Sequence, residues 1–166
     1  MKKWILLSLL GGIVFLSSCN NKSQKVQANE SEVASHAPVE TETNSNGEPW
    51  TEQQLMEPRE LAQVIKTSTD SPVIISLGAG GIIPGSKDTG ASGEKKGLQN
   101  LKEELEAMSK DTEIVLYCGC CPFDICPNVR PAFSLLNDMG FKNHHLLNLR
   151  DNIKVDWIDR GYPTGN

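Results

Sequence analysis

The chain has 166 residues, five cysteines and a formal net charge of -5. This length allows one ordinary domain together with additional segments. The acidic balance, without a basic stripe that would meet phosphates, argues against a nucleic-acid partner. Aliphatic runs are frequent from Trp50 onward, so we expect one modest core within residues 50–166.

The N-terminal residues predict export and a lipid anchor. Lys2 and Lys3 precede an apolar run over residues 5–16, which is short for a membrane span and typical of a signal peptide. The run ends in Leu16-Ser17-Ser18-Cys19, which resembles the bacterial lipobox. The resemblance implies a lipoprotein signal peptide over residues 1–19 and a lipidated Cys19, which would anchor the protein to the membrane on the extracytoplasmic side of the bacterial cell envelope, in the periplasm or at the surface. The alternative is an ordinary signal peptide with a chance cysteine.

Residues 20–49 are predicted to form a disordered polar tether. They are rich in Asn, Ser, Glu, Gln and Thr and contain no aromatic residue before Trp50. Such a segment buries too little apolar surface to offset the entropy lost on ordering. His36 lies in this segment, and we interpret it as inert rather than as a ligand.

From residue 50 onward, helical and strand patterns alternate. A helix is predicted from Pro58, whose missing N–H costs nothing in a first turn, and Ser71-Pro72 ends it. A buried strand over residues 73–77 and a glycine-rich loop over residues 78–97 come next. A second amphipathic helix then carries its apolar face on Leu98, Leu101, Leu105 and Met108.

The second half of the domain repeats this alternation. A buried strand over residues 113–117 leads directly into a loop that contains four cysteines. A third helix is predicted between a cap at Asn128 and a stop at Gly140, followed by a strand over residues 145–149 and a last short helix. Strands that alternate with helices predict an α/β domain with a mainly parallel sheet, and ligands of such sheets bind beyond the carboxyl ends of the strands.

Residues from about Trp50 to Pro163 resemble the rhodanese-like domain family. The matching segments are the loop Gly81-Ile82-Ile83-Pro84-Gly85-Ser86, the strand Ile114-Val115-Leu116-Tyr117 with Cys118 after it, Arg130, and the C-terminal stretch Gly140-Phe141-Lys142-Asn143, Leu149 to Trp157, Gly161, Tyr162 and Pro163. The resemblance implies a rhodanese-like domain over residues 50–166, with helices on both faces of the sheet. It also implies that Cys118 is the nucleophile and that Arg130 closes the active-site loop.

Two departures from the family pattern stand out. The Asp and Arg that usually follow the first buried strand are replaced by Ser76-Leu77-Gly78, and Ile82 stands where His is usual. The loop from Cys118 to Arg130 is longer than in the family, and the extra length contains Cys120, Cys121 and Cys126. The chain therefore looks like a distinct subgroup with an extended cysteine-rich loop.

The chemistry of Cys118 and Arg130 suits sulfur transfer. A thiol attacks sulfur only as the thiolate, and a free cysteine has a pKa of about 8.5, so the loop and the helix N-terminus must stabilise the anion. Arg130 offers a fixed positive fork for an oxyanion such as thiosulfate. We therefore expect an extracytoplasmic sulfurtransferase that carries sulfane sulfur as a persulfide on Cys118, with a small sulfur-donor anion and a thiol acceptor as partners. No cofactor is expected.

The three additional cysteines leave several hypotheses open. Cys120, Cys121 or Cys126 could resolve an oxidised Cys118 by forming a disulfide, or all four could form structural disulfides. Alternatively, the thiols could bind a metal, for which the spacing favours cuprous copper over zinc and for which His144 or His145 could assist. A further hypothesis is a non-catalytic domain that keeps the fold as a docking surface.

Overall fold

The computed structural model describes residues 47–165. The predicted signal peptide, Cys19, His36 and the tether up to residue 46 lie outside the described residues. Among residues 47–165, no helix combines the length and the apolar character needed to cross a membrane.

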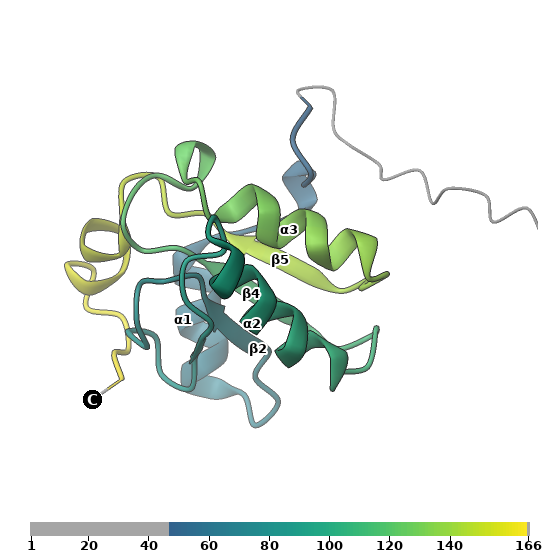
Figure 1. Cartoon of the computed structure of the whole chain (residues 1–166). Coiled ribbons are helices and arrows are strands. Elements are labelled where there is room, and N and C mark those ends of the chain that lie inside the picture. The colour runs from purple at the N-terminus through teal and green to yellow at the C-terminus, as the bar shows by residue number, and fades with distance from the viewer. Residues whose placement is uncertain (1–46, 166) are drawn as a thin grey trace, which may run out of the picture. The chain divides into compact units, whose positions relative to one another are not determined.

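A five-stranded parallel sheet forms the centre of the domain (Figure 1), with the strand order β1-β5-β4-β2-β3. The strands are β1 (Leu55–Met56), β2 (Val73–Ser76), β3 (Lys87–Asp88), β4 (Ile114–Tyr117) and β5 (His144–Leu147). The predicted α/β class and the parallel sheet are confirmed. β4 lies in the middle of the sheet, so the loop that follows it leaves from the centre of the carboxyl edge.

Helices cover both faces of this sheet, as the sequence predicted. The α-helices are α1 (Pro58–Thr67), α2 (Lys95–Glu106) and α3 (Val129–Asp138). Short 3-10 turns η1 (Glu52–Gln54) and η2 (Phe123–Ile125) and a π-helical turn η3 (Lys154–Ile158) complete the elements. α2 and α3 lie on one face and α1 lies on the other (Figure 1).

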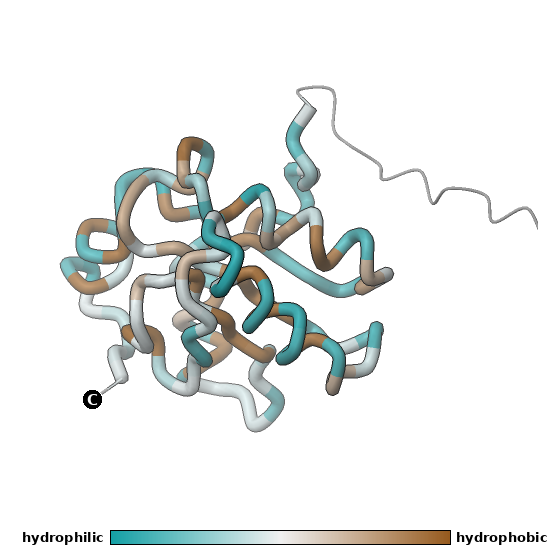
Figure 2. The backbone as a smooth tube through the Cα atoms, viewed as in Figure 1, coloured by the Kyte–Doolittle hydropathy of each residue, from teal (hydrophilic) through white to brown (hydrophobic). Residues whose placement is uncertain are grey.

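Two buried clusters explain this layering. Side chains of a strand alternate between its faces, and in β4 Ile114 and Leu116 pack in the cluster formed with α2 and α3. Val115 and Tyr117 pack in the opposite cluster, which contains residues of α1 and Trp157 of η3. Hydrophobic colour is concentrated on the central strands and alternates with hydrophilic colour along α2 (Figure 2). Cys118 continues the alternation of β4 and packs on the α2 and α3 side.

Candidate functional site

Cys118 follows the last residue of β4 and is almost fully buried, with 3% of its surface exposed. Its position at the carboxyl edge of the central strand is where ligands of open α/β sheets bind. The neighbouring Tyr117 points to the opposite face, where its hydroxyl donates a hydrogen bond of 2.8 Å to the carbonyl of Gly80. The end of β4 therefore places the Cys118 thiol at the site, while the preceding Tyr117 anchors the loop after β2 on the opposite face.

The loop after Cys118 begins with a close backbone approach at Gly119. A Cβ atom on this residue would lie 2.7 Å from Cγ2 of Ile153 and 2.9 Å from Cβ of Ala79, so no larger residue fits without a shift. The Gly119 carbonyl accepts a 3.1 Å hydrogen bond from the N–H of Ile153, and the N–H of Phe123 donates a 3.0 Å bond to the carbonyl of Leu149. These contacts fix the loop against the chain segment that follows β5.

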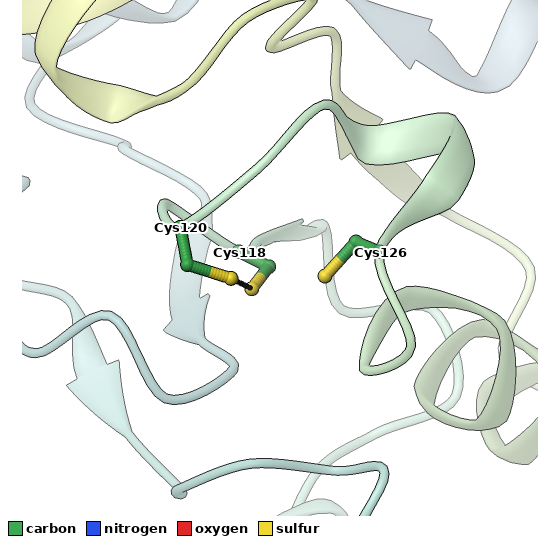
Figure 3. Close-up of side chains that lie close together, drawn as sticks. All are labelled: Cys118, Cys120 and Cys126. Carbon is green, nitrogen blue, oxygen red and sulfur yellow. Dashed lines mark hydrogen bonds between the residues drawn. The ribbon is translucent and has the colours of Figure 1, made fainter.

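Three thiols converge within this loop (Figure 3): the Sγ atoms of Cys118, Cys120 and Cys126 all lie within 4.8 Å of one another. The Sγ atoms of Cys118 and Cys120 are 3.3 Å apart. Cys126 is fully buried, whereas Cys120 is exposed to solvent. Cys121 lies outside the group, although its Sγ is 3.3 Å from that of Cys120. Within residues 47–165 all four thiols are free, so this part of the chain contains none of the structural disulfides that were one of the sequence-based hypotheses.

Asn128 connects two of these sulfurs. Its side-chain Nδ2 donates to the Sγ of Cys118 over 3.5 Å, and its own N–H donates to Cys126. The Oδ1 atom accepts a 2.9 Å hydrogen bond from the N–H of Gly93, which fixes the orientation of the amide. We predicted from the sequence that Asn128 caps α3. It does occupy the N-cap position, but its side chain makes no cap hydrogen bond.

Hydrogen bonds from its neighbours stabilise the thiolate form of Cys118. Donation from the Cys126 thiol is the largest influence, and together with Asn128 and Cys120 it outweighs burial and lowers the pKa of Cys118 to about 5. The pKa of Cys126 is raised, first because its proton bonds to Cys118 and second because it is buried. Cys120 is exposed as a residue, but partial desolvation of its thiol and the contacts with Cys118 and Cys121 raise its pKa to about 12. The site therefore holds one thiolate surrounded by two protonated thiols and an amide.

Arg130 lies in the first turn of α3, but its hydrogen bonds lead away from the thiolate. Its Nη2 pairs with the carboxylate of Glu48 at 2.5 Å and donates to the carbonyl of Asp124 at 2.6 Å. The guanidinium also lies over the ring of Trp50, 5.5 Å from its centroid. Arg130 thus connects η2, α3 and the segment before η1. The predicted contact with a substrate oxyanion stays a prediction, because in this structure the guanidinium is bound by Glu48.

The segment before η1 contacts the site helix, a feature that sequence reasoning missed. Besides Glu48, the carbonyl of Pro49 accepts a 2.8 Å hydrogen bond from the side chain of Asn137 in α3. Trp50 packs edge-on against Phe123 of η2 and against Phe133 of α3. In the sequence, residues 48 and 49 have the polar character of the tether, and only Trp50 indicates where packing begins.

The two histidines lie at the other end of the sheet. His144 pairs with Ile114 at the start of β4, four residues before Cys118, a separation of roughly 13 Å along a strand. The hypothesis that His144 or His145 assists a metal at the cysteine loop is therefore wrong. Burial lowers the pKa of His144 to about 4, and its Nε2 bonds to Asn137 at 2.9 Å, so this residue is a neutral part of the core.

Comparisons with known proteins agree with this architecture. No protein-family profile and no curated protein matches the chain. The solution structure of the rhodanese-like domain of the Alr3790 protein from Anabaena sp. is similar with a TM-score of 0.50 at 17% sequence identity, covering 68% of this chain and 79% of that one. The crystal structure of the Alr3790 protein matches with a TM-score of 0.49 at 17% identity, covering 67% and 91%. The similarity to the solution structure shows that the chain has a rhodanese-like fold, as the sequence predicted, and a cysteine cluster lies at the carboxyl edge of its sheet.

Proposed function

We propose that this domain is a sulfurtransferase that carries sulfane sulfur as a persulfide on Cys118. The observation that supports the proposal best is the environment of the Cys118 sulfur. It sits beyond the central strand of a rhodanese-like fold and accepts hydrogen bonds from Asn128 and from neighbouring thiols. These donors stabilise an anionic sulfur without a cofactor, and a thiolate is the form that attacks sulfur.

The proposed reaction has two displacement steps. The Cys118 thiolate attacks the outer sulfur of thiosulfate, the sulfur–sulfur bond of the donor breaks, and sulfite leaves with the electron pair. The product is a persulfide on Cys118, whose terminal sulfur again carries negative charge close to the same donors. An acceptor thiolate then attacks this terminal sulfur, leaves as a persulfide and regenerates the Cys118 thiolate.

The additional thiols allow a second fate for the persulfide. The sulfur of Cys120 lies 3.3 Å from that of Cys118, and Cys120 is exposed to solvent. Attack by a neighbouring thiol on the inner sulfur would form an intramolecular disulfide and release hydrosulfide, so that the sulfane sulfur is reduced and two thiols are oxidised. A cellular dithiol would then restore the reduced site. Cys126 is the alternative resolving residue, and Cys121 lies outside the three converging sulfurs but next to Cys120.

We place this activity outside the cytoplasm. The proposal of an envelope lipoprotein anchored through Cys19 rests on the sequence of residues 1–19 alone. Expression in a bacterium with labelled palmitate tests it: the wild-type chain should become labelled in the membrane fraction. The Cys19→Ser variant should be unlabelled, and labelling of that variant would contradict the anchor.

A turnover assay tests the enzymatic activity. The reduced chain is incubated with thiosulfate and a small thiol acceptor, and the release of sulfite is followed. Cys118→Ser should abolish turnover, whereas Cys121→Ser, the matched control from the same loop, should retain it. Equal sulfite release by wild type and Cys118→Ser would contradict the role of Cys118.

A further inference from the structure

We propose that Cys118, Cys120 and Cys126 also form a three-thiolate site for a cuprous ion. This inference goes beyond the proposed sulfurtransferase activity, because metal binding needs no sulfur donor or acceptor. It starts from the convergence of three sulfurs from two parts of the loop, before and after η2 (Figure 3). Among residues 47–165, this is the group of donor side chains whose ligand atoms lie close enough to hold one metal ion.

The separations of the sulfurs agree with a bound ion better than with a disulfide. A metal–sulfur bond of about 2.3 Å places the three sulfurs of a planar three-coordinate site about 4.0 Å apart. A disulfide requires a sulfur–sulfur distance of about 2.05 Å. The observed separations include 3.3 Å between Cys118 and Cys120 and stay below 4.8 Å for all three pairs. Changes of less than about 1 Å in these separations would therefore bring all three sulfurs to bonding distance from a single ion.

The two buried sulfurs already have the hydrogen bonds that metal-bound thiolates need. Asn128 donates from its side chain to Cys118 and from its backbone to Cys126. The backbone N–H of Cys120 also donates to Cys118. Such donors orient the ligands and offset the negative charge that three thiolates place around a monovalent ion. Because Gly93 fixes the amide of Asn128, these donors are in place before an ion arrives.

The number and type of ligands select the ion. Thiolates prefer soft ions such as cuprous copper and zinc, but structural zinc is almost always four-coordinate. Cys121 lies outside the group of converging sulfurs, and the two histidines lie at the opposite end of the sheet. A cuprous ion accepts three sulfur ligands and needs no fourth. The exposed Cys120 provides the side from which the ion enters and leaves.

Metal binding and sulfur transfer use the same Cys118 sulfur and exclude one another. Binding is a ligand exchange without a change of oxidation state: the Cys120 and Cys126 thiols lose their protons to solvent and the three sulfurs replace the ligands that deliver the ion. The copper-loaded form should therefore accept no sulfur from thiosulfate. Removal of the ion should restore the free thiolate.

Competition against a coloured cuprous chelator tests the site. The full chain is reduced, kept under anaerobic conditions and titrated into cuprous bicinchoninate. We expect one ion per chain and a cuprous affinity that Cys120→Ser lowers by about tenfold or more. Cys121→Ser is the matched control, an adjacent cysteine outside the three-sulfur group, and should bind as the wild type does. Because Cys120 is exposed, its serine variant should keep the fold, which a thermal melt verifies; Cys126→Ser replaces a buried side chain and serves only as a second variant if it melts normally.

Several results would overturn the proposal. Failure of the reduced, folded chain to take cuprous ion from the chelator would do so, as would unchanged affinity in folded Cys120→Ser. Equal weakening by Cys121→Ser would show a different ligand set. Preference for zinc over cuprous ion in the same competition would contradict the three-coordinate assignment. None of these results depends on whether the metal-free chain transfers sulfur.

Discussion

The Nδ2 atom of Asn128 lies 3.5 Å from the Sγ of Cys118, and this amide connects the start of α3 with the end of β4. Its other polar atom accepts the N–H of Gly93, so the donor points at the sulfur and not away from it. An Asn at a helix N-cap would ordinarily bond to the helix backbone. Here it is directed to the thiolate, and the nucleophile depends on a residue ten positions away.

Removal of this amide should raise the pKa of Cys118. In the wild type we expect alkylation of Cys118 by a small haloacetamide to be half-maximal near pH 5 and to be lost below it, since the thiolate is then protonated. Asn128→Ala should move this midpoint upward by roughly one unit, because a hydrogen bond to a charged group is worth about 1.5–3 kcal/mol. Mass mapping of the alkylated peptide identifies the residue. A wild-type midpoint near the pKa of an ordinary cysteine would contradict the assigned charge.

Gly119 should tolerate no side chain. A Cβ atom there meets Ile153 at 2.7 Å, and overpacking of this kind costs about 1–3 kcal/mol. Gly119→Ala should lower the melting temperature and slow the loading of Cys118 with sulfur. Gly81→Ala is the matched control, because its Cβ would meet its nearest neighbour at an ordinary 3.7 Å. Equal stability of the two variants would show that the loop does not need the close approach.

Variants of Arg130 and of its partner Glu48 separate a structural role of the guanidinium from a role in substrate binding. If the guanidinium mainly holds the loop, Arg130→Ala and Glu48→Gln should both reduce stability by about 1 kcal/mol or less, as expected for a partly exposed ion pair. If Arg130 also binds the donor oxyanion, Arg130→Ala should raise KM for thiosulfate while Glu48→Gln leaves it unchanged or lowers it. Steady-state kinetics and thermal melts of both variants distinguish these roles. An unchanged KM for thiosulfate in Arg130→Ala would show that Arg130 does not bind the oxyanion.

His144 should make the domain acid-sensitive. Burial lowers its pKa to about 4, so between its ordinary pKa of 6.5 and pH 4 the unfolded chain binds a proton that the folded chain does not. Stability is therefore lost as the pH falls through this window. Between pH 7 and pH 4, we expect the free energy of unfolding of His144→Gln to fall by about 1–2 kcal/mol less than that of the wild type. One pKa unit is worth about 1.4 kcal/mol, and solvent screening reduces the total. Denaturant melts at pH 7 and pH 4 measure it; parallel pH dependence of wild type and variant would contradict this source.

The sequence predicted the elements that have a strong hydrophobic pattern. β2 and β4 are continuous or nearly continuous apolar runs, β5 ends in an apolar Leu-Leu pair, and the three α-helices have amphipathic faces. β1 and β3 were missed because each has two residues, and β3 consists of the exposed Lys87 and Asp88, which no hydrophobic pattern identifies. α2 begins at Lys95, three residues before the first apolar residue that marked it. Short strands that form only through pairing with a neighbouring strand show no periodic hydrophobic pattern in the sequence.

The candidate site was predictable only in part. The position of Cys118 followed from the strand that precedes it, whereas the approach of Cys126 depends on the path of an irregular loop. Asn128 carried the signal of an ordinary helix cap, and its role at the thiolate depends on the distant Gly93. The partner of Arg130, Glu48, lies 82 positions earlier, in a segment whose composition resembles a tether. Such long-range polar contacts have no local pattern.

The most direct test of the central claim is the intact mass of the reduced chain after a single incubation with thiosulfate. We predict a gain of one sulfur atom, which peptide mapping locates on Cys118, a small thiol removes and Cys118→Ser lacks. A chain whose Cys118 is demonstrably free and metal-free would contradict it if thiosulfate and other sulfane-sulfur donors left neither added sulfur nor a new disulfide at Cys118.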